Sequence, residues 1–512
     1  MHACLKLEEI LHEIFSQADY RSLTIFARTC RLFYEPALNA IYSDLPGIEP
    51  LIKRLPQDLW SANSGGLVIR RPLRIQDWEV FASYSRRVRS LRLRWFASDV
   101  QFYRALSSPP DPSFLMPNLR TFTWHCLSTR SAGLDTITAF IHLLLSHNLA
   151  EAHLTVSEHA LTVFSDLGCT SLRKLVIQSP NAPISANVTE DVICSHSALK
   201  SLACGEITVR ALHHLSQFPS LSRLTIGLGD DVPSALAFAK SPFRKLRYLT
   251  INSKSIDPCL SMLKATNWNI RCFHHRMDVA YDPAGRGALL ELLPLQLSHE
   301  SLKCISLFSN ATPRLDDDPI TDPLSLNPLF RFKHLRILEF SGSIIPALDN
   351  TGLLKLAEAW PQLQVLIFQQ KAGQYHVPRI DLTGLVLLLE HCPDLYQLTL
   401  SVNAIIDTKA PPAPPISTAS TNNTRITSIN FCNSPISKAA EVAAFLSAIT
   451  PNLRETSSWT GAVMPDSCGT VQEYQRRWDS VAEMVPVFAA VRKQEREACI
   501  MRTQAKRHVG RK

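Results

Sequence analysis

Paired histidines, scattered cysteines and one glycine-rich turn are the features of this sequence whose residue types could carry chemistry. Neighbouring histidines occur at 213–214 and 274–275, but neither pair has further ligands at the spacing that a zinc site needs. The stretch GLGDD at 227–231 is too short for a dinucleotide-binding loop and is predicted to be a turn after a strand. No nucleophile–base arrangement or phosphate loop is visible. We therefore expect no catalytic residue, no bound metal and no cofactor, and hence a chain that is not an enzyme.

Cysteine usage and composition predict an intracellular, folded protein. The 512 residues include thirteen cysteines, an odd number with no CxxC or CxC pair, which is typical of a reducing compartment. Glu8, Glu9, His12 and Glu13 interrupt any secretion signal, and no segment offers about eighteen uninterrupted apolar residues. With 46% hydrophobic and 19% charged residues, the chain should fold. We expect a protein of the cytoplasm and/or nucleus with no membrane partner.

A short motif with apolar residues at positions 1, 4 and 6 recurs through most of the chain. Successive copies start 22 to 33 residues apart, and no interval is left unfilled. They lie at 88–93, 119–124, 149–154, 172–177, 199–204, 221–226, 246–251, 270–275, 302–307, 335–340, 363–368, 395–400 and 426–431, with a weak further copy near 452–456. Helix-like stretches such as LDTITAFIHLLLSH and AAEVAAFLSAI separate them. Each repeat therefore predicts one short strand followed by one helix.

One strand and one helix cannot bury their apolar faces alone, so the repeats must stack. Three inward side chains per repeat then contribute roughly 1.5–3 kcal/mol each. Consecutive strands are expected to pair in parallel with helices outside, which gives an α/β solenoid with a parallel concave sheet. A doubly wound domain also alternates strand and helix and is the alternative, but the spacing favours the solenoid.

This motif resembles the leucine-rich repeat over roughly residues 85–460, in an irregular version. The Asn that the family places eight positions after the first Leu occurs only at Asn310 and Asn403. The resemblance implies a horseshoe-shaped array whose turns are closed differently from repeat to repeat.

The first forty residues instead have apolar residues at helical spacing. Two stripes are formed by Leu7, Ile10, Leu11, Ile14 and Phe15, and by Leu23, Phe26, Ala27 and Cys30. Pro36 can open a third helix, where its missing N–H does no harm. A cluster of this size buries too little surface to be stable alone. Its apolar face is therefore expected to be completed by a partner or, alternatively, to cap the open end of the array.

The opening stretch resembles an F-box, the helical domain that docks on the adaptor Skp1 and thereby on a cullin ubiquitin ligase. The match is carried by Leu7, Glu9-Ile10-Leu11, Ile14-Phe15, Leu23, and Cys30-Arg31 with Phe33, although Glu8 stands where Pro is common. The following LPGIEPLIKRLPQDLW resembles the segment after the box in fungal F-box proteins. The resemblance implies a Skp1-like adaptor interface made by Leu7, Glu9, Ile10, Leu11, Ile14, Phe15, Leu23, Cys30 and Phe33.

The concave face can be derived from the alternation of side chains along each strand. If positions 4 and 6 face the core, positions 3, 5 and 7 line the exposed side of the sheet. The candidate target-binding residues there are Thr123, His153, Lys174, Val176, Arg223, Thr225, Thr250, His274, Arg276, Ser306, Glu339, Ile367, Thr399 and Asn430. This mostly neutral face suits protein or peptide recognition better than a phosphate backbone, which needs several adjacent cations.

Two basic patches leave a different class of partner open. Residues 70–94 hold eight arginines against Asp77 and Glu79, and residues 492–512 hold eight Lys or Arg against two Glu. Either patch could contact nucleic acid or act as a nuclear import signal. The alternative, which we favour, is solvated charge whose Arg stems cover the ends of the array.

These patterns predict the domain organisation and the function. We expect an F-box-like helical domain at 1–45, a connecting segment at 46–87, the repeat array at 88–460 with a flexible Pro/Ser/Thr-rich insertion at 407–425, and a C-terminal helix with a basic tail at 461–512. The expected function is that of a substrate receptor of a Skp1–cullin–F-box ubiquitin ligase, bound to an unknown target protein. An interaction scaffold without ligase recruitment is the first alternative, and a nucleic-acid-associated protein is a less favoured one.

Overall fold

The computed structural model describes residues 7–63, 66–94, 100–111, 115–126, 134–144, 148–162, 171–180, 183–232, 236–238, 242–309, 325–342, 346, 348–369, 378–406, 423–459 and 469–509. The chain divides into two compact units, each of which is described by itself. Unit 1 comprises Met1–Gly229 and Phe238–Leu246, and unit 2 comprises Asp230–Ala237 and Arg247–Lys512.

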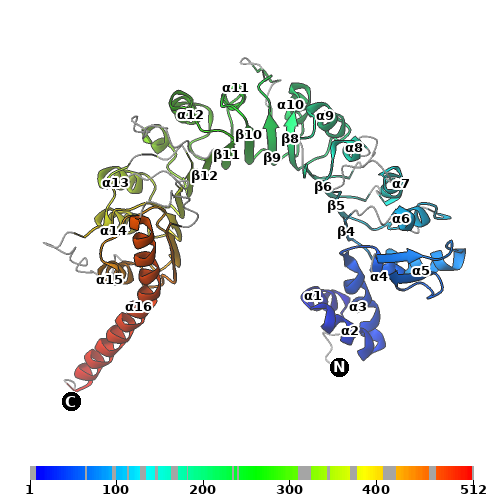
Figure 1. Cartoon of the computed structure of the whole chain (residues 1–512), viewed down its shortest axis with the longest axis horizontal. Helices are drawn as coiled ribbons and strands as arrows, with labels where there is room; N and C mark the ends of the chain where they lie inside the picture. The colour runs from blue at the N-terminus through cyan, green and yellow to red at the C-terminus, as the bar shows by residue number, and fades with distance from the viewer. Residues whose placement is uncertain are drawn as a thin grey trace. The chain divides into compact units, whose positions relative to one another are not determined.

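The sheet of unit 1 is parallel, and its strands follow one another in chain order. It consists of β1 (Asp44–Leu45), β4 (Ser90–Arg94), β5 (Thr121–His125), β6 (Glu151–Thr155), β7 (Lys174–Gln178), β8 (Ser201–Ile207) and β9 (Arg223–Leu228). The helices α6 (Val100–Leu106), α7 (Leu134–Leu144), α8 (Glu158–Leu161), α9 (Ala186–Cys194) and α10 (Val209–Ser216) alternate with these strands (Figure 1).

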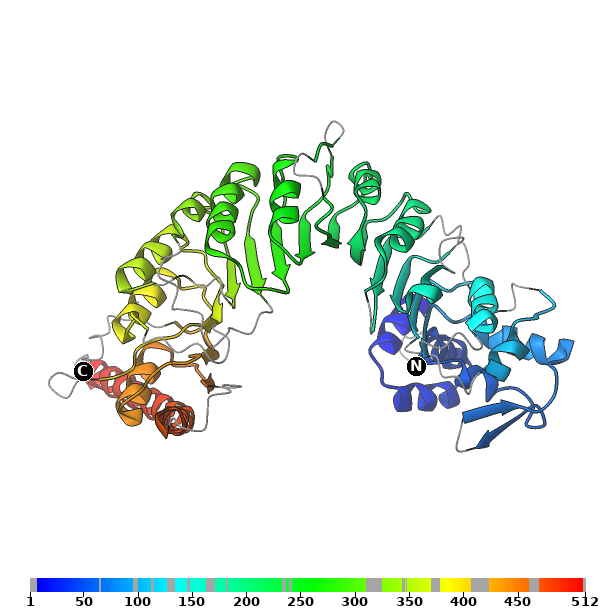
Figure 2. The ribbon, with the colours of Figure 1, turned by 45° about the horizontal axis from the view of Figure 1, so that its top comes forward.

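Unit 2 repeats the same arrangement. Its parallel strands are β10 (Tyr248–Ser253), β11 (Cys272–Met277), β12 (Cys304–Ser309), β13 (Ile337–Ser341), β14 (Val365–Gln369), β15 (Gln397–Thr399), β16 (Ser428–Asn430) and β17 (Glu455–Ser457). The intervening elements are α11 (Asp257–Lys264), α12 (Pro283–Gln296), the 3-10 helix η5 (Asn327–Arg331), α13 (Asn350–Ala359), α14 (Leu382–His391) and α15 (Ala439–Ile449). Figure 2 shows strands β10 to β14 side by side, with helices along one side of them.

Both units therefore have the architecture of an α/β solenoid, as the repeats predict. Every predicted copy of the motif carries a strand that begins at its third position, and the weak copy near 452–456 supplies β17. The apolar positions are the core: Leu246, Leu249 and Ile251 of one repeat are all buried. Successive repeats are also joined by backbone bonds beside the strands: the Arg120 N–H donates to Arg89 O at 2.8 Å and the Lys200 N–H to Arg173 O at 2.7 Å.

At several turns a side-chain amide forms a hydrogen bond between neighbouring repeats. The residue just before the first apolar position reaches back to a backbone carbonyl of the preceding repeat. Asn118 Nδ2 donates to Arg86 O at 2.7 Å, Asn148 Nδ2 to Pro117 O at 3.0 Å and Asn452 Nδ2 to Thr424 O at 2.7 Å. These bonds satisfy carbonyls that the turn would otherwise leave unpaired.

The parallel sheet starts at residue 44 rather than at the expected residue 88. Asp44 and Leu45 pair with Ser90 and Leu91. The predicted connecting segment, 46–87, contains α4 (Glu49–Ile52), an antiparallel hairpin of β2 (Trp60–Asn63) and β3 (Gly66–Ile69), and α5 (Ile75–Ser85). The motif is absent at β1 because Pro46 follows Leu45 and has no N–H for a sheet, so the strand ends after two residues.

Three helices precede this sheet: α1 (Glu8–Ser16), α2 (Tyr20–Thr29) and α3 (Arg31–Ser43). Asp19 caps α2, because its carboxylate accepts a hydrogen bond from the Ser22 N–H at 3.2 Å. Pro36 lies inside α3 instead of opening it. The helix begins one turn earlier, so Pro36 removes a single helical N–H bond.

The last helix, α16 (Gly469–Val509), packs against the end of the array through its first half. Trp478, Val481 and Val485 are buried, and Trp478 stacks on Phe431 with ring centroids 4.3 Å apart. None of the described helices combines the length and apolarity that crossing a bilayer requires.

The predicted flexible insertion, 407–425, lies largely outside the described residues. At its end, however, Asn423 is buried and ordered. Its Nδ2 donates to Leu395 O at 2.9 Å, and its Oδ1 accepts from the Ile426 N–H at 3.0 Å. The array therefore resumes at residue 423.

Candidate functional site

The helical cluster α1–α3 has its own core, which contains four of the residues predicted to contact an adaptor. Leu11, Phe15 and Leu23 are buried together with Ala37, and Phe33 is partly buried against them. The Phe15 ring lies 5.8 Å from that of Phe33, edge to face. These four side chains therefore hold the helices to one another. The resemblance to an F-box assigned all the matching motif residues to the interface alike, whereas these four pack inside the cluster.

The other side of the α1 stripe is exposed. Leu7, Ile10 and Ile14 have 52%, 36% and 42% of their surface accessible, and Glu9 beside them is exposed too. Their spacing of three and four residues places them on one helix face. Cys30, also predicted to contact the adaptor, is half-buried where α2 ends and α3 begins.

Four further exposed apolar side chains in the cluster were not predicted: Tyr20, Ile25, Leu32 and Tyr34. Among the described residues, seven of the eighteen exposed large apolar side chains lie within residues 7–34. Exposed large apolar side chains are therefore concentrated in the helical cluster. The sequence carried a signal for Ile25, because it is an apolar residue outside the stripe formed by Leu23 and Phe26.

The cluster is joined to the array without a linker. Helix α3 runs directly into β1, and the Arg89 N–H donates to Ser43 O at 2.9 Å. Arg87, almost fully buried, forms an ion pair with Glu35 at 2.7 Å. The α3 end of the cluster thus covers the start of the sheet, as the capping alternative expects. Capping does not account for the exposed face of α1.

The predicted concave residues form continuous rows across the face of each sheet that carries no helix. In unit 1 the register places Thr123, His153 and Val176 on neighbouring strands. The same row continues through Ala203 to Thr225. All three of the first residues are half-buried, as expected of side chains on an open sheet.

In unit 2 one row contains seven of the predicted residues: Thr250, His274, Ser306, Glu339, Ile367, Thr399 and Asn430. Arg276, two residues beyond His274 on β11, is exposed. Thr399 differs from the others because only 7% of its surface is accessible. It lies where the turn after β16 folds back toward β14, with Cys432 Sγ 3.7 Å from Phe368 O. Thr399 is therefore in the predicted row but cannot meet a partner directly.

Charged residues on the unit 1 face are largely paired with one another. Glu151 accepts from Lys174 Nζ at 3.3 Å and lies 3.6 Å from His153 Nε2. Arg92 pairs with Asp44 at 2.9 Å, and Arg223 is exposed. This pattern of both signs on a sheet suits a protein surface and does not make the row of cations that nucleic acid requires.

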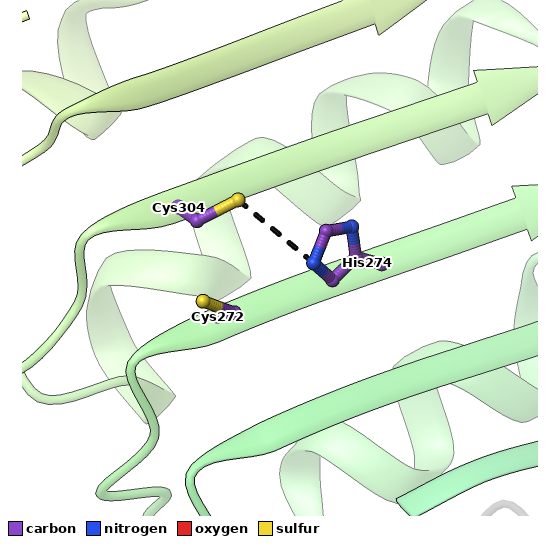
Figure 3. A group of neighbouring side chains, drawn as sticks. All are labelled: Cys272, His274 and Cys304. Carbon is purple, nitrogen blue, oxygen red and sulfur yellow. Dashed lines mark hydrogen bonds between the residues drawn. The ribbon is translucent and has the colours of Figure 1, made fainter. Parts of the chain in front are cut away.

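The unit 2 face contains a group of soft metal ligands. Cys272 and His274 lie on β11 and Cys304 lies on β12, directly opposite Cys272 (Figure 3). Their ligand atoms all lie within 4.8 Å of one another, and Cys304 Sγ is 3.8 Å from His274 Nε2. A hydrogen bond with Cys272, together with burial, raises the pKa of the Cys304 thiol.

The expectation that the pair 274–275 lacks zinc partners is thus wrong for His274. The partners come from position 3 of its own repeat and position 3 of the next one. Alignment of the repeats would have shown this, because parallel strands in register place equal positions side by side. The local spacing does not, since Cys304 follows His274 by 30 residues.

The other features singled out in the sequence are structural. His275 is fully buried between Ser253 and Tyr281. His214 Nε2 lies 3.2 Å from His196 O, and the His213 ring contacts Phe238. In GLGDD, Gly227 is part of β9, and a Cβ there would lie 2.7 Å from Glu206 N.

The arginine patch at 70–94 is partly neutralised. Arg71 pairs with Asp58 at 2.7 Å and with Asp77 at 2.6 Å, and its two carboxylates raise the pKa of the guanidinium. With Arg87 on Glu35 and Arg92 on Asp44, three of the eight arginines are in ion pairs. Pairing with carboxylates thus lowers the positive charge that this patch presents.

The basic end of α16 contributes a second cationic region. Arg492 donates to Ser447 Oγ and Ala444 O, each at 3.1 Å, near the end of α15. A hollow of about 330 Å³ beside it is lined by Arg454, Lys493 and Arg496 together with Glu497. Arg492 therefore joins α16 to α15, which is a structural role.

Comparison with known proteins gives only distant likenesses. No family model and no curated protein matches the sequence. Among solved structures, the Rad7–Elc1 complex of yeast aligns with 73% of this chain and 92% of its own, at 13% identity and a TM-score of 0.31. A TLR13 complex with the single-stranded RNA ssRNA13 aligns with 77% of this chain and 65% of its own, at 10% identity and a TM-score of 0.29. The fold assignment therefore rests on the strand order and register of this chain.

Proposed function

We propose that this protein is a non-catalytic substrate receptor of a Skp1–cullin–F-box ubiquitin ligase. Helices α1–α3 dock on a Skp1-like adaptor, and the open strand faces hold a target protein for ubiquitin transfer by other subunits. The observation that carries the proposal is the exposed apolar face of α1, formed by Leu7, Ile10 and Ile14.

The geometry of the cluster supports docking by this face. Leu11 and Phe15 secure α1 to α2 and α3, so the exposed face is presented by a folded element. Burying the apolar face of α1 in a partner groove would stabilise a complex by roughly 1.5–3 kcal/mol per large side chain. The direct passage from α3 into β1 would hold the adaptor in a defined direction relative to the sheet of unit 1.

The strand faces suit a protein target. The rows consist of small, polar and apolar side chains with charges of both signs, such as Thr250, Ile367 and Glu339. Protein interfaces combine such apolar and polar groups, whereas nucleic acid demands a surplus of cations.

Co-expression with a Skp1-like adaptor tests the proposal. The wild type should copurify with the adaptor, and the double substitution Ile10→Asp, Ile14→Asp should weaken binding by at least about 100-fold, since two apolar contacts are replaced by charges. Both side chains are exposed, so the cluster should remain folded. The matched control is Val487→Asp, Val491→Asp, which adds the same charges to exposed positions of α16.

Because α1 packs inside the cluster and is also proposed to contact the adaptor, the folding of the double variant must be measured together with its binding. Circular dichroism and thermal unfolding should be the same for both variants as for the wild type. If the wild type fails to bind the adaptor, or if the α1 variant binds as well as the α16 control, the chain is an interaction scaffold and the ligase proposal is wrong.

A further inference from the structure

Two cysteines and a histidine meet on the strand face of unit 2. Cys272 and His274 are two residues apart on β11 and therefore project from the same face. Cys304 is the register partner of Cys272 on β12. Figure 3 shows the three side chains close together on the two strands, with the Cys304 sulfur directed toward the His274 ring. Among the described residues, this is the one group of three or more Cys, His, Asp or Glu whose ligand atoms converge in this way.

The dimensions match those of a tetrahedral zinc site. Zn–S bonds of about 2.3 Å and Zn–N bonds of about 2.0–2.1 Å place ligand atoms roughly 3.6–3.8 Å apart along the edges of the tetrahedron. Cys304 Sγ and His274 Nε2 are 3.8 Å apart, and all three ligand atoms lie within 4.8 Å of one another. Side-chain rotations that move a ligand atom by up to about an ångström complete the site, because the parallel register already brings the three residues together.

The charge balance also suits a divalent cation. Two thiolates and one neutral imidazole would balance the charge of Zn²⁺, so the occupied site would have no net charge. Burying a neutral site costs little free energy. Cys304 is buried, while Cys272 and His274 are half-buried. Arg276 on β11 and Glu339 on β13 lie on the same face and have opposite charges. Soft sulfur and imidazole ligands favour zinc over magnesium or calcium.

We propose that Cys272, His274 and Cys304 bind one Zn²⁺ ion. The fourth position of the tetrahedron points away from the sheet and is filled by water in the isolated chain. Three protein ligands with one open position are typical of zinc sites that accept an exogenous ligand, whereas closed structural sites use four. This site is independent of adaptor docking, so its test does not depend on the proposed function.

Metal titration of the full chain tests the site. The reduced protein, freed of metal by a chelator, is titrated with Zn²⁺ against a chromophoric chelator and, separately, with Co²⁺. The expected result is one tight equivalent of Zn²⁺, and a Co²⁺ complex with a thiolate-to-cobalt charge-transfer band and the intense d–d bands of four-coordinate cobalt.

Variants identify the ligands. Cys304→Ser and His274→Ala should each weaken Zn²⁺ binding by more than about tenfold, since removing groups that merely support ligands already costs roughly 10–100-fold. His274→Ala is an independent arm, because His274 is half-buried and its loss leaves the core side chains in place. Cys194→Ser is the matched control, a half-buried cysteine on α9 of unit 1.

Three results would overturn the inference. The first is wild-type protein that binds no equivalent of Zn²⁺. The second is a charge-transfer band that persists in both Cys304→Ser and His274→Ala. The third is a band lost in Cys194→Ser, which would move the site elsewhere in the chain.

Discussion

At the scale of single residues, a buried histidine shows how the solenoid uses polar groups in its core. His275 Nε2–H donates to Ser253 Oγ at 2.9 Å, and the Tyr281 hydroxyl donates to His275 Nδ1 at 2.8 Å. Both ring nitrogens are therefore satisfied by the neutral imidazole. Burial lowers the pKa of His275 to about 4 and raises the pKa of Tyr281, so the tyrosine stays a donor.

This arrangement predicts a loss of stability in mild acid. The unfolded chain takes up a proton on His275 below pH 6.5, whereas the folded chain does not until about pH 4. The stability that neutral His275 provides is complete above pH 6.5 and declines as the pH falls toward 4, by about 3 kcal/mol in total. Urea unfolding between pH 4 and pH 8, in chelator to keep the protein free of metal, measures it.

Comparison of two variants isolates this contribution from other titrating groups. In His275→Gln the free energy of unfolding should fall less between pH 6.5 and pH 4 than it does in the wild type. Thr250→Gln, at a half-buried position without a titrating group, should leave the wild-type slope unchanged. An unaltered slope in His275→Gln would contradict the assignment.

At the scale of elements, α1 illustrates how one helix serves two surfaces. Its apolar residues cover an arc wide enough to reach the cluster core through Leu11 and Phe15 and to leave Ile10 and Ile14 outside. A helix stripe of this width is expected wherever an element packs on its own domain and on a partner.

In helix α16 the packed and the exposed residues lie in different halves of the helix instead of on different faces. Its first half packs on α15 and β17, where Trp478 Nε1 donates to Ser434 O at 2.9 Å. From Lys493 to Met501 every residue is exposed. The packed half covers the open edge of the unit 2 sheet, as terminal elements of a solenoid must.

The packed half of α16 should therefore be essential to stability. Trp478→Ala removes a buried ring and its hydrogen bond and is expected to cost about 3–5 kcal/mol. Val487→Ala, on the same helix but exposed, should change stability by less than about 0.5 kcal/mol. Thermal unfolding and limited proteolysis of α16 report both effects, and equal stability of the two variants would show that α16 does not cap the array.

At the scale of the whole molecule, the distribution of charge limits the class of partner. The net charge of +8 is concentrated in two segments, and three of the eight arginines in the first one are paired with carboxylates. The formal charge of a patch therefore overstates the cationic surface that a ligand meets.

Binding to generic duplex DNA should accordingly be weak. At physiological salt the affinity is expected to be no tighter than the weak end of non-specific binding, a Kd of about 10⁻⁴ M. The triple substitution Arg86→Gln, Arg89→Gln, Arg94→Gln, at exposed positions, should leave adaptor capture unchanged. Fluorescence anisotropy across a salt series measures the binding. Tight binding that falls steeply with salt and is lost in this variant would favour the nucleic-acid alternative.

What the sequence determined by itself is the repeated architecture. The strand positions, their parallel order, the helices between them and the row of residues on the open face all follow from apolar spacing within about thirty residues. Such spacing lies within one repeat, and every repeat buries its apolar side chains in the same way, by stacking on its neighbours.

Only the tertiary structure decided which apolar residues of α1 face inward and which arginines have carboxylate partners. It also showed that the sheet begins at β1, where the motif is missing. These features depend on contacts between residues far apart in the chain. The rotation of a helix about its axis and the ion pairs of a side chain are set by packing between segments that are distant in the sequence. Local apolar spacing does not specify that packing.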